Sequence, residues 1–286
     1  MNILITGAKG FLGKELTKYL SKNYNVIAAD RNILNPAKYE SVKSFFTNNK
    51  IDIVIHTAIK GGKRGQKENI EDFYENLLMF NNLVEHSMHY KKLINFGSGA
   101  EFDRSTDINN AVEDQVLLST PKDYYGLSKN LITRKICKLN NNTYNLRLFG
   151  CFGVEEEPQR LLRATFNNIS QNKNPIILGD KFMDYFFVED VARVVEFVIN
   201  NEDIEYKDIN LSYNKKFKLS NLVYKVKDLM HSNCEVEIQN SALKNFSYTG
   251  DPRRLQTLKI DLVGLEAGIK TCIEQWKEKN NVDFKK

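Results

Sequence analysis

The sequence predicts an α/β protein: a parallel, doubly wound sheet with helices on both faces, followed by a smaller C-terminal α/β lobe. Two observations lead to this prediction. Short apolar segments rich in β-branched residues alternate with segments of helical periodicity, without a break, over residues 2–150. Beyond residue 150 the alternation becomes irregular, although amphipathic helices continue. We therefore expect a sheet domain at 1–150 and a smaller lobe at 151–286, with an approximate boundary that the chain can cross.

Each element of the first part follows from one of two patterns. Apolar, β-branched runs predict the strands, and apolar residues spaced three or four apart predict the helices between them. In chain order we expect a strand at 2–6, a helix at 11–20, a strand at 25–30, a helix at 41–50, a strand at 51–58, a helix at about 70–90, a strand at 92–98, a helix at 123–139 and a strand at 143–150.

The elements of the second part are shorter or more widely spaced. A proline at a first helical position favours a helix start near Pro158. We further expect short strand-like segments at 174–180 and 207–212, and amphipathic helices at 187–201, 219–230 and 264–279. No internal repeat or Pro/Gly-rich linker separates the two parts, so the second is expected to assemble on the first.

Composition excludes several classes of function. There are 41 Lys and Arg against 36 Asp and Glu, and a net charge of +5 is too small to favour nucleic-acid binding. No apolar run approaches the roughly 18 residues of a membrane span, and no signal peptide precedes the first strand. The four cysteines are widely separated, which predicts free thiols in a reducing compartment and no metal site. We therefore expect a cytoplasmic protein.

The turn "TGAKGFLG" carries Gly7, Gly10 and Gly13 between the first strand and the first helix. The first glycine allows the sharp turn, the second lets backbone N–H groups approach a pyrophosphate, and the third lets helix and strand pack closely. The helix N-terminus, at Phe11 and Leu12, adds a partial positive charge. This context predicts a Rossmann-type dinucleotide site, with an ordinary strand-to-helix turn as the alternative.

Two adjacent residues at the end of the second strand point to different cofactors. The Asp30 carboxylate can accept hydrogen bonds from an adenosine ribose, which favours NAD. Arg31 can pair with a 2′-phosphate, which favours NADP. An ordinary strand-end turn with a solvated Arg31 is the third interpretation, and the sequence leaves all three open.

Tyr125 and Lys129 in "DYYGLSK" lie four residues apart and therefore share one helix face. A lysine ammonium there lowers the pKa of the phenol, which can then act as general acid or base. The spacing alone proves nothing, because Tyr39 and Lys43 show it without a functional context. Tyr125 differs because Ser98 ends the preceding strand, and strand carboxyl ends line one crevice in a doubly wound sheet.

Taken together, these motifs resemble the extended short-chain dehydrogenase/reductase family, also known as the NAD-dependent epimerase/dehydratase family. The likeness is strongest to the GDP-fucose synthase-like nucleotide-sugar 4-ketoreductases. It runs through "ITGAKGFLG", "DIVIHTA", "AIKGGKRG", "NFGSGAEF" and "YYGLSK", then "MDYFFVEDVA", "GDPRRL" and "GLEAGIKTCIEQW". The resemblance thus covers most of the chain.

The resemblance implies roles for the motif residues. Ser98 would hydrogen-bond the reacting sugar oxygen, Tyr125 would transfer a proton to or from it, and Lys129 would tune Tyr125 and bind the nicotinamide ribose. The cofactor would be NADPH/NADP, with NAD possible as the alternative, and Ala58 and Lys60 would lie near it. The partners implied are a nucleotide-diphosphate sugar and a second copy of the chain in a homodimer.

Departures from the family pattern narrow the reaction. Family 4,6-dehydratases place an Asp-Glu pair after the active-site hydroxyl residue, where this chain has Gly99 and Ala100. GDP-fucose synthase carries an acid/base cysteine at the position of Ala100, and the one histidine of the second lobe, His231, lies far from the matched segments. We therefore expect a C4 reductase of a 4-keto-6-deoxy sugar nucleotide, hexose or heptose, without epimerase activity.

Arginines of the second lobe are candidates for the substrate diphosphate, because the guanidinium fork matches phosphate geometry. We expect Arg160 and Arg253 there, beside Ser98 and Gly99 at the sugar, with Arg163 and Arg254 as further candidates. Met183 stands where the family often has arginine, so GDP is favoured by resemblance alone. The alternatives are a nucleotide-sugar 4-epimerase that keeps its NAD bound and, more distantly, a non-catalytic NADP-sensing protein.

Overall fold

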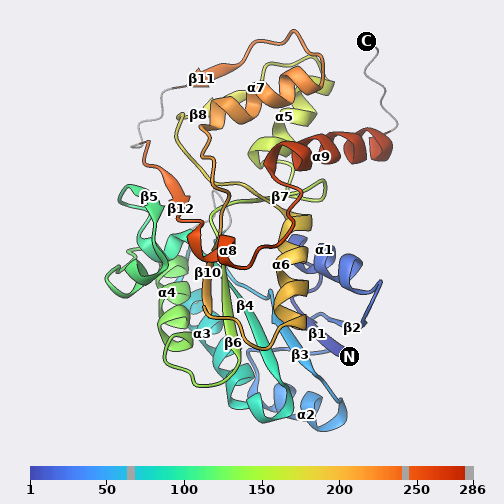
Figure 1. Ribbon diagram of the computed structural model, residues 1–286, viewed down its shortest axis with the longest axis vertical. Helices are drawn as coiled ribbons and strands as arrows, with labels where there is room; N and C mark the ends of the chain where they lie inside the picture. The colour runs from blue at the N-terminus through green and yellow to red at the C-terminus, as the bar shows by residue number, and fades with distance from the viewer. Residues whose placement is uncertain (63–67, 240–244, 281–286) are drawn as a thin grey trace.

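The computed structural model describes residues 1–62, 68–239 and 245–280. Its centre is a parallel sheet of six strands in the order β10-β6-β4-β3-β1-β2 (Figure 1). The strands are β1 (Asn2–Thr6), β2 (Asn25–Ala29), β3 (Ile53–His56), β4 (Lys92–Ser98), β6 (Thr143–Leu148) and β10 (Asp208–Leu211). The predicted α/β class with a Rossmann-type, doubly wound parallel sheet is confirmed.

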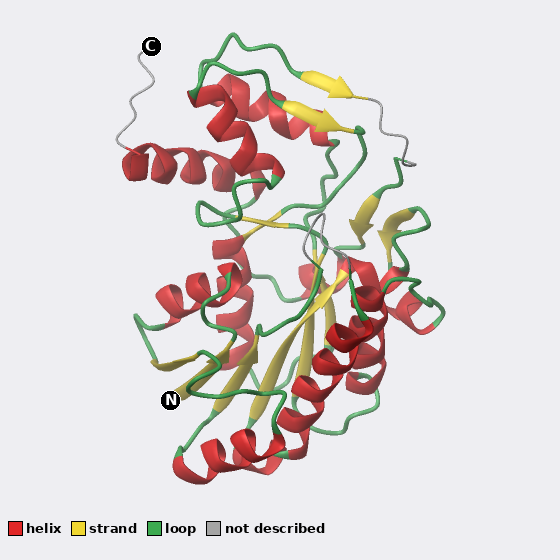
Figure 2. Ribbon diagram, turned by 180° about the vertical axis from the view of Figure 1, so that it is seen from behind, coloured by secondary structure: helices red, strands yellow, loops and turns green. Residues whose placement is uncertain are grey.

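Helices cover both faces of this sheet, as Figure 2 shows. One face packs against α1 (Phe11–Leu20) and α6 (Val188–Asn200), and the other against α2 (Tyr39–Asn48), α3 (Ile70–Glu85) and α4 (Tyr124–Ile136). Because successive strand residues point to opposite faces, every second residue of a strand enters the same core.

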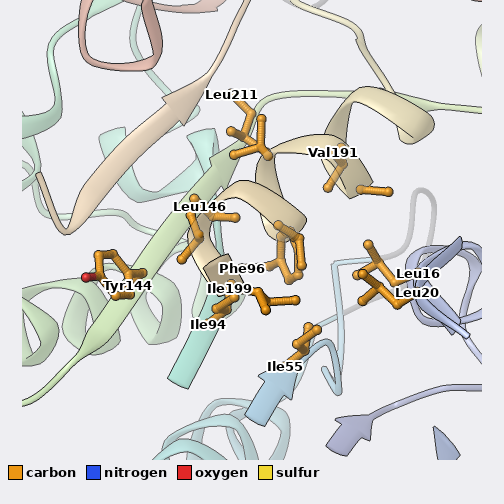
Figure 3. Packing of buried hydrophobic residues seen from close by; sticks show 14 of the residues in the cluster. Leu16, Leu20, Ile55, Ile94, Phe96, Tyr144, Leu146, Val191, Ile199 and Leu211 are labelled. Carbon is orange, nitrogen blue, oxygen red and sulfur yellow. The ribbon is translucent and has the colours of Figure 1, made fainter. Parts of the chain in front are cut away.

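The alternation is visible in β1. Ile3 and Ile5 join the core beneath α1 and α6, whereas Leu4 joins the core beneath α2, α3 and α4. Figure 3 shows the first of these cores, in which Leu16 of α1 and Val191 of α6 approach the sheet. A strand buried on both faces needs apolar residues at every position, which explains the continuous apolar runs of the sequence.

The C-terminal part lies beyond the carboxyl ends of the strands (Figure 1). Its core joins α5 (Leu161–Ser170), α7 (Leu219–Leu229) and α9 (Leu265–Asn280). Three two-stranded pairs accompany it: β7 (Cys151–Phe152) with β9 (Phe186–Phe187), β8 (Ile176–Leu178) with β11 (Glu237–Gln239), and β5 (Ile108–Ala111) with β12 (Tyr248–Gly250). The shorter helices are η1 (Ser87–His89), η2 (Gly99–Phe102), η3 (Glu113–Leu117) and α8 (Arg253–Thr257).

Three details differ from the sequence-based expectation. The helix expected to start near Pro158 is α5, which begins at Leu161 with Arg160 as its N-cap residue. The helix expected at about 70–90 ends at Glu85, and a short 3₁₀ turn follows it. The segment expected as a minor strand at 207–212 is β10, the edge strand of the main sheet, where it pairs with β6. The chain therefore returns from the second part to the main sheet. The four residues of β10 form too short an apolar pattern to indicate which sheet the strand joins.

No helix within residues 1–62, 68–239 and 245–280 combines the length and the apolar character needed to cross a bilayer.

Candidate active site

The glycine turn lies at the point where the strand order reverses. The neighbours of β1 are β2 on one side and β3 on the other, so the loops after β1 and β3 meet. Gly7 has φ +71°, and a Cβ there would lie 2.6 Å from the Cα of Ala58. A Cβ on Gly13 would lie 2.5 Å from the carbonyl oxygen of Gly7. Both positions therefore require glycine.

The same turn leaves the start of α1 open to a ligand. Gly10 is the N-cap residue and has no side chain to cap the helix. The first backbone N–H groups of a helix, here those of Phe11, Leu12 and Gly13, lack intrahelical acceptors. Free N–H groups and the helix dipole suit a pyrophosphate, so the turn fits a dinucleotide.

Charged side chains surround the end of β2. The Asp30 carboxylate accepts the N–H of Asn32 at 2.9 Å and lies 2.5 Å from Lys9 Nζ. The Lys9 hydrogen bond is the main cause that lowers the pKa of Asp30. Arg31 Nη2 lies 3.1 Å from Glu75 Oε1, and Lys60 Nζ lies 3.5 Å from Glu75 Oε2. Sequence reasoning missed Lys9 and Glu75, although Lys9 stands inside the glycine turn.

Ser98 lies at the carboxyl end of β4 and is 8% exposed. Its hydroxyl accepts the Ala100 N–H at 3.2 Å, and its own N–H donates to Glu101 Oε1 at 2.7 Å. The buried Glu101 also accepts hydrogen bonds from Arg147 Nε at 2.8 Å and Thr133 Oγ1 at 2.9 Å. Ser98 is thereby fixed by a buried carboxylate that links β4, α4 and β6.

Tyr125 lies in the first turn of α4, which Asp123 caps by accepting the Gly126 N–H at 2.7 Å. The Tyr125 N–H donates to Glu68 Oε2 at 3.0 Å, and the Arg104 guanidinium lies 5.7 Å from the centre of its ring. Burial raises the pKa of Tyr125, whereas its hydrogen bond with Ser98 and the charge of Arg104 lower it. The phenol is therefore protonated at neutral pH and can donate a proton.

Lys129 lies one turn further along α4 and is buried. Its ammonium donates to the Phe96 carbonyl oxygen at 2.6 Å. Burial lowers the pKa of Lys129 to about 8, and the Glu101 carboxylate opposes this shift. Ser98, Tyr125 and Lys129 thus gather at the ends of β4 and the start of α4, on the same edge of the sheet as the glycine turn.

The structure adds a residue that the sequence did not suggest. The Tyr248 hydroxyl of β12 lies 3.4 Å from Ser98 Oγ. Arg104 and Glu68, described above beside Tyr125, were also missed. None of the three belongs to a local motif, and only the tertiary fold brings them to Ser98.

The arginines expected at the substrate separate into two groups. Arg160 is exposed at the N-cap of α5, and its charge contributes to lowering the pKa of Tyr125. Arg253 is 73% exposed and pairs with Asp251 at 2.8 Å. Arg163 Nη1 instead donates to the Val154 carbonyl at 2.8 Å, and Arg254 Nη2 lies 2.7 Å from Asp114. Arg163, Arg253 and Arg254 therefore all hold contacts within the chain, and the two groups differ in exposure, since the side chains of Arg160 and Arg253 are exposed and those of Arg163 and Arg254 are not.

Gly99 packs against aromatic rings, since a Cβ there would lie 2.4 Å from Phe149 Cδ1. The segment 58–65 falls partly outside the described residues, which end at Gly62 before this gap. Within the described part of the chain, no three His, Cys, Asp or Glu side chains come together in a way that could hold a metal ion.

Comparison with known protein families matches residues 3–212 to a model described as the NAD dependent epimerase/dehydratase family. This chain belongs to that family. The resemblance inferred from the sequence motifs is confirmed, and the glycine turn, Ser98 and Tyr125 all lie within the matched part of this epimerase/dehydratase chain.

Relatives within the epimerase/dehydratase family are distant. A GDP-L-fucose synthase of Sinorhizobium fredii is 29% identical over 151 aligned residues, covering 50% of this chain and 47% of that protein. A dTDP-D-glucose 4,6-dehydratase of Dictyostelium discoideum is 25% identical over 247 aligned residues, covering 71% of this chain and 56% of that protein. The chain thus spans about half the length of these two curated relatives.

Among solved structures, the chain resembles MlghC, a GDP-mannoheptose C4 reductase from Campylobacter jejuni with NADP bound. The TM-score is 0.83 at 21% sequence identity, and the alignment covers 97% of this chain and 98% of the reductase. This likeness extends over both parts of the fold.

Proposed function

We propose that this protein is an NADPH-dependent C4 reductase of a nucleotide-linked 4-keto-6-deoxy sugar. One observation carries the proposal: Ser98 at the end of β4 is close enough to Tyr125 of α4 to lower the pKa of its phenol, and the two residues after Ser98 carry no acid. Two carboxylates adjoin this pair. Glu101 is buried and bound by Arg147, Thr133 and the backbone of Ser98, and Glu68 accepts the backbone N–H of Tyr125 and pairs with Arg104. Both are therefore unsuited to removing a proton from a sugar carbon, as a dehydratase or C3/C5 epimerase must.

The proposed mechanism needs one hydride and one proton. When bound, the reduced nicotinamide supplies the hydride to C4 of the sugar. Ser98 donates a hydrogen bond to the C4 oxygen, and Tyr125 gives its phenolic proton to the same oxygen, so that the ketone becomes an alcohol. Lys129 would hold the nicotinamide ribose, and the positive charge of Arg104 stabilises the phenolate left on Tyr125; Lys129, whose ammonium donates to the Phe96 carbonyl, is not among the groups that lower this pKa.

The sugar nucleotide is proposed to carry GDP, because two of the similar proteins are named for GDP-linked sugars. Arg160 and Arg253 are the proposed diphosphate contacts, since both are exposed to solvent and the charge of Arg160 acts on Tyr125. We also propose a homodimer through α3 and α4. This is supported by the exposed apolar side chains of Tyr74 and Leu78 on α3 and of Leu131 on α4.

The reaction is tested by incubating a 4-keto-6-deoxy sugar nucleotide with the enzyme and NADPH in deuterated water. We expect consumption of NADPH in step with substrate and no deuterium at C3 or C5 of the product by mass spectrometry. An enzyme-free sample corrects for spontaneous exchange. Deuterium at either carbon above that background would contradict the absence of epimerase activity, and inversion of C4 in a 4-hydroxy sugar nucleotide without net change of the cofactor would point to a 4-epimerase.

The preference for NADPH is proposed to depend on the cations around β2. Lys9 partly neutralises Asp30, and Arg31 and Lys60 share the single carboxylate of Glu75, which leaves net positive charge for a 2′-phosphate. We expect Arg31→Leu to lower kcat/KM for NADPH about tenfold, because the variant loses a charge-assisted hydrogen bond. The value of kcat/KM for NADH should change by less than about twofold.

Steady-state kinetics with both cofactors measure this selectivity, and Arg193→Leu on α6 serves as the control. An equal loss with NADPH and NADH would contradict a role for Arg31 at the 2′-phosphate.

A further inference from the structure

A second tyrosine is held rigidly beside Ser98. Tyr248 begins β12, which lies next to β5 in Figure 1 and pairs with it. Its backbone N–H donates to the Phe182 carbonyl at 2.8 Å, and its carbonyl accepts the Asp184 N–H at 3.0 Å. Contacts on both sides therefore fix the position from which the side chain extends.

The Tyr248 ring is fixed as well. It meets Phe149 edge-on, with ring centres 5.4 Å apart and planes at 72°. A Cβ on Gly99 would lie 2.9 Å from Tyr248 Cζ. The glycine after Ser98 is therefore the residue that makes room for this ring, and any larger side chain at position 99 would displace it.

The hydroxyl of Tyr248 is directed into the candidate site. It lies 3.4 Å from Ser98 Oγ, and the same serine also lowers the pKa of Tyr125. Ser98 thus stands between two phenols, one from α4 and one from β12. The second phenol has no role in the proton transfer proposed above, because Tyr125 already supplies the proton.

Electrostatics keep Tyr248 in its neutral form. Burial is the main cause that raises the pKa of Tyr248, and the neighbouring Tyr125 raises it further, against the lowering effect of Ser98 and Arg104. A phenol that stays protonated at neutral pH is a hydrogen-bond donor. Because Tyr125 already supplies the proton, the neutral hydroxyl of Tyr248 is available to donate a hydrogen bond to an oxygen atom of the substrate.

The proposed function determines which oxygen that is. Ser98 and Tyr125 hold the C4 oxygen, and the two carbons next to C4 in a 6-deoxypyranose are C3, which carries a hydroxyl, and C5, which does not. Oxygens on neighbouring ring carbons are separated by about the length of a hydrogen bond, as the two hydroxyls of Tyr248 and Ser98 are.

We propose that Tyr248 donates a hydrogen bond to the C3 hydroxyl of the substrate and so selects 4-keto sugars that carry this hydroxyl. The assignment rests on the proposed C4 reduction. In this assignment Tyr248 determines substrate specificity, and it contacts the substrate and not the cofactor. A site that binds a hydroxyl in this way discriminates against the analogue that lacks it.

The test compares Tyr248→Phe with the wild-type enzyme on two substrates, a 4-keto-6-deoxy sugar nucleotide and its 3-deoxy analogue. Removing one neutral hydrogen bond is expected to lower kcat/KM for the hydroxylated substrate about tenfold. For the 3-deoxy analogue, wild type and variant should agree within about twofold. NADP⁺ affinity should not change. Tyr224→Phe is the matched control, because Tyr224 is exposed on α7.

Equal losses on the two substrates would overturn the proposal, and so would a wild-type enzyme that does not distinguish them. The comparison of the two substrates on the wild-type enzyme needs no variant, so it tests the proposal even if Tyr248→Phe does not fold. A wild-type enzyme that reduces neither substrate, nor any other 4-keto sugar nucleotide, would instead overturn the proposed function on which the assignment rests.

Discussion

Replacement of Tyr125 by phenylalanine is expected to lower kcat about a thousandfold while leaving NADP⁺ affinity unchanged, because a positioned general acid contributes roughly 10²–10⁴-fold. The substitution removes only the phenolic hydroxyl, whose pKa Ser98 lowers. The backbone contacts of Tyr125 with Glu68 and the Asp123 cap at the start of α4 do not depend on that hydroxyl.

Single-turnover kinetics and a fluorescence titration with NADP⁺ measure the two quantities separately. Tyr124→Phe is the control, because Tyr124 is 40% exposed and points away from Ser98 by its place on the helix. If the Tyr125 variant kept more than about a tenth of the wild-type kcat, another group would have to be the acid. Tyr248 would then be the first candidate, since its hydroxyl also approaches Ser98.

Replacement of Arg147 by methionine is expected to lower the free energy of unfolding by about 3–5 kcal/mol, because it leaves buried carboxylates without their cation. Arg147 is fully buried, and its Nη2 lies 2.7 Å from Glu101 Oε2 and 2.8 Å from Asp208 Oδ2. Glu101 in turn holds the backbone of Ser98. Urea denaturation followed by circular dichroism measures the loss.

The loss in the Arg147 variant should depend on pH. Burial raises the pKa of Glu101, and Arg147 is the main influence that lowers it, so the variant raises this pKa further. A carboxyl group with a raised pKa in the folded state binds more protons there than in the unfolded state, so stability falls as pH rises. The difference from wild type should therefore be smaller at pH 5 than at pH 8.

Arg193→Met is the control for this experiment. Arg193 pairs with Glu189 at 3.1 Å on the surface of α6, with both side chains about one third exposed. Such pairs contribute about 0–1 kcal/mol, so this variant should stay within about 1 kcal/mol of wild type at both pH values. A loss in the Arg147 variant no larger than in this control would contradict the role of the buried network.

Much of the fold could be predicted because its signals are local. The apolar runs of β1, β3 and β4 reflect strands buried on both faces. Gly7 could be predicted as a glycine of a tight strand-to-helix turn, and its positive φ and close approach to Ala58 exclude other residues there. The spacing of Tyr125 and Lys129 likewise follows from helix geometry alone.

The rest of the site depends on contacts between distant parts of the chain. Tyr248 is 150 positions from Ser98, and nothing in "SYTGDPRRL" indicates that its hydroxyl reaches the end of β4. The partner of Arg31 is Glu75 on α3, which a strand-end motif cannot specify. The same holds for β10, whose place in the sheet is decided by its pairing with β6.

The position of β10 has a consequence for how the chain acquires its structure during synthesis. The edge of β6 has no neighbour on its outer side until Leu211 has left the ribosome, although β6 itself ends at Leu148. An open strand edge can pair with other chains, and growing chains fold domain by domain from the N-terminus. The first 150 residues therefore cannot complete their sheet as an early, independent intermediate: the sheet has to wait while about sixty further residues of the C-terminal part are translated.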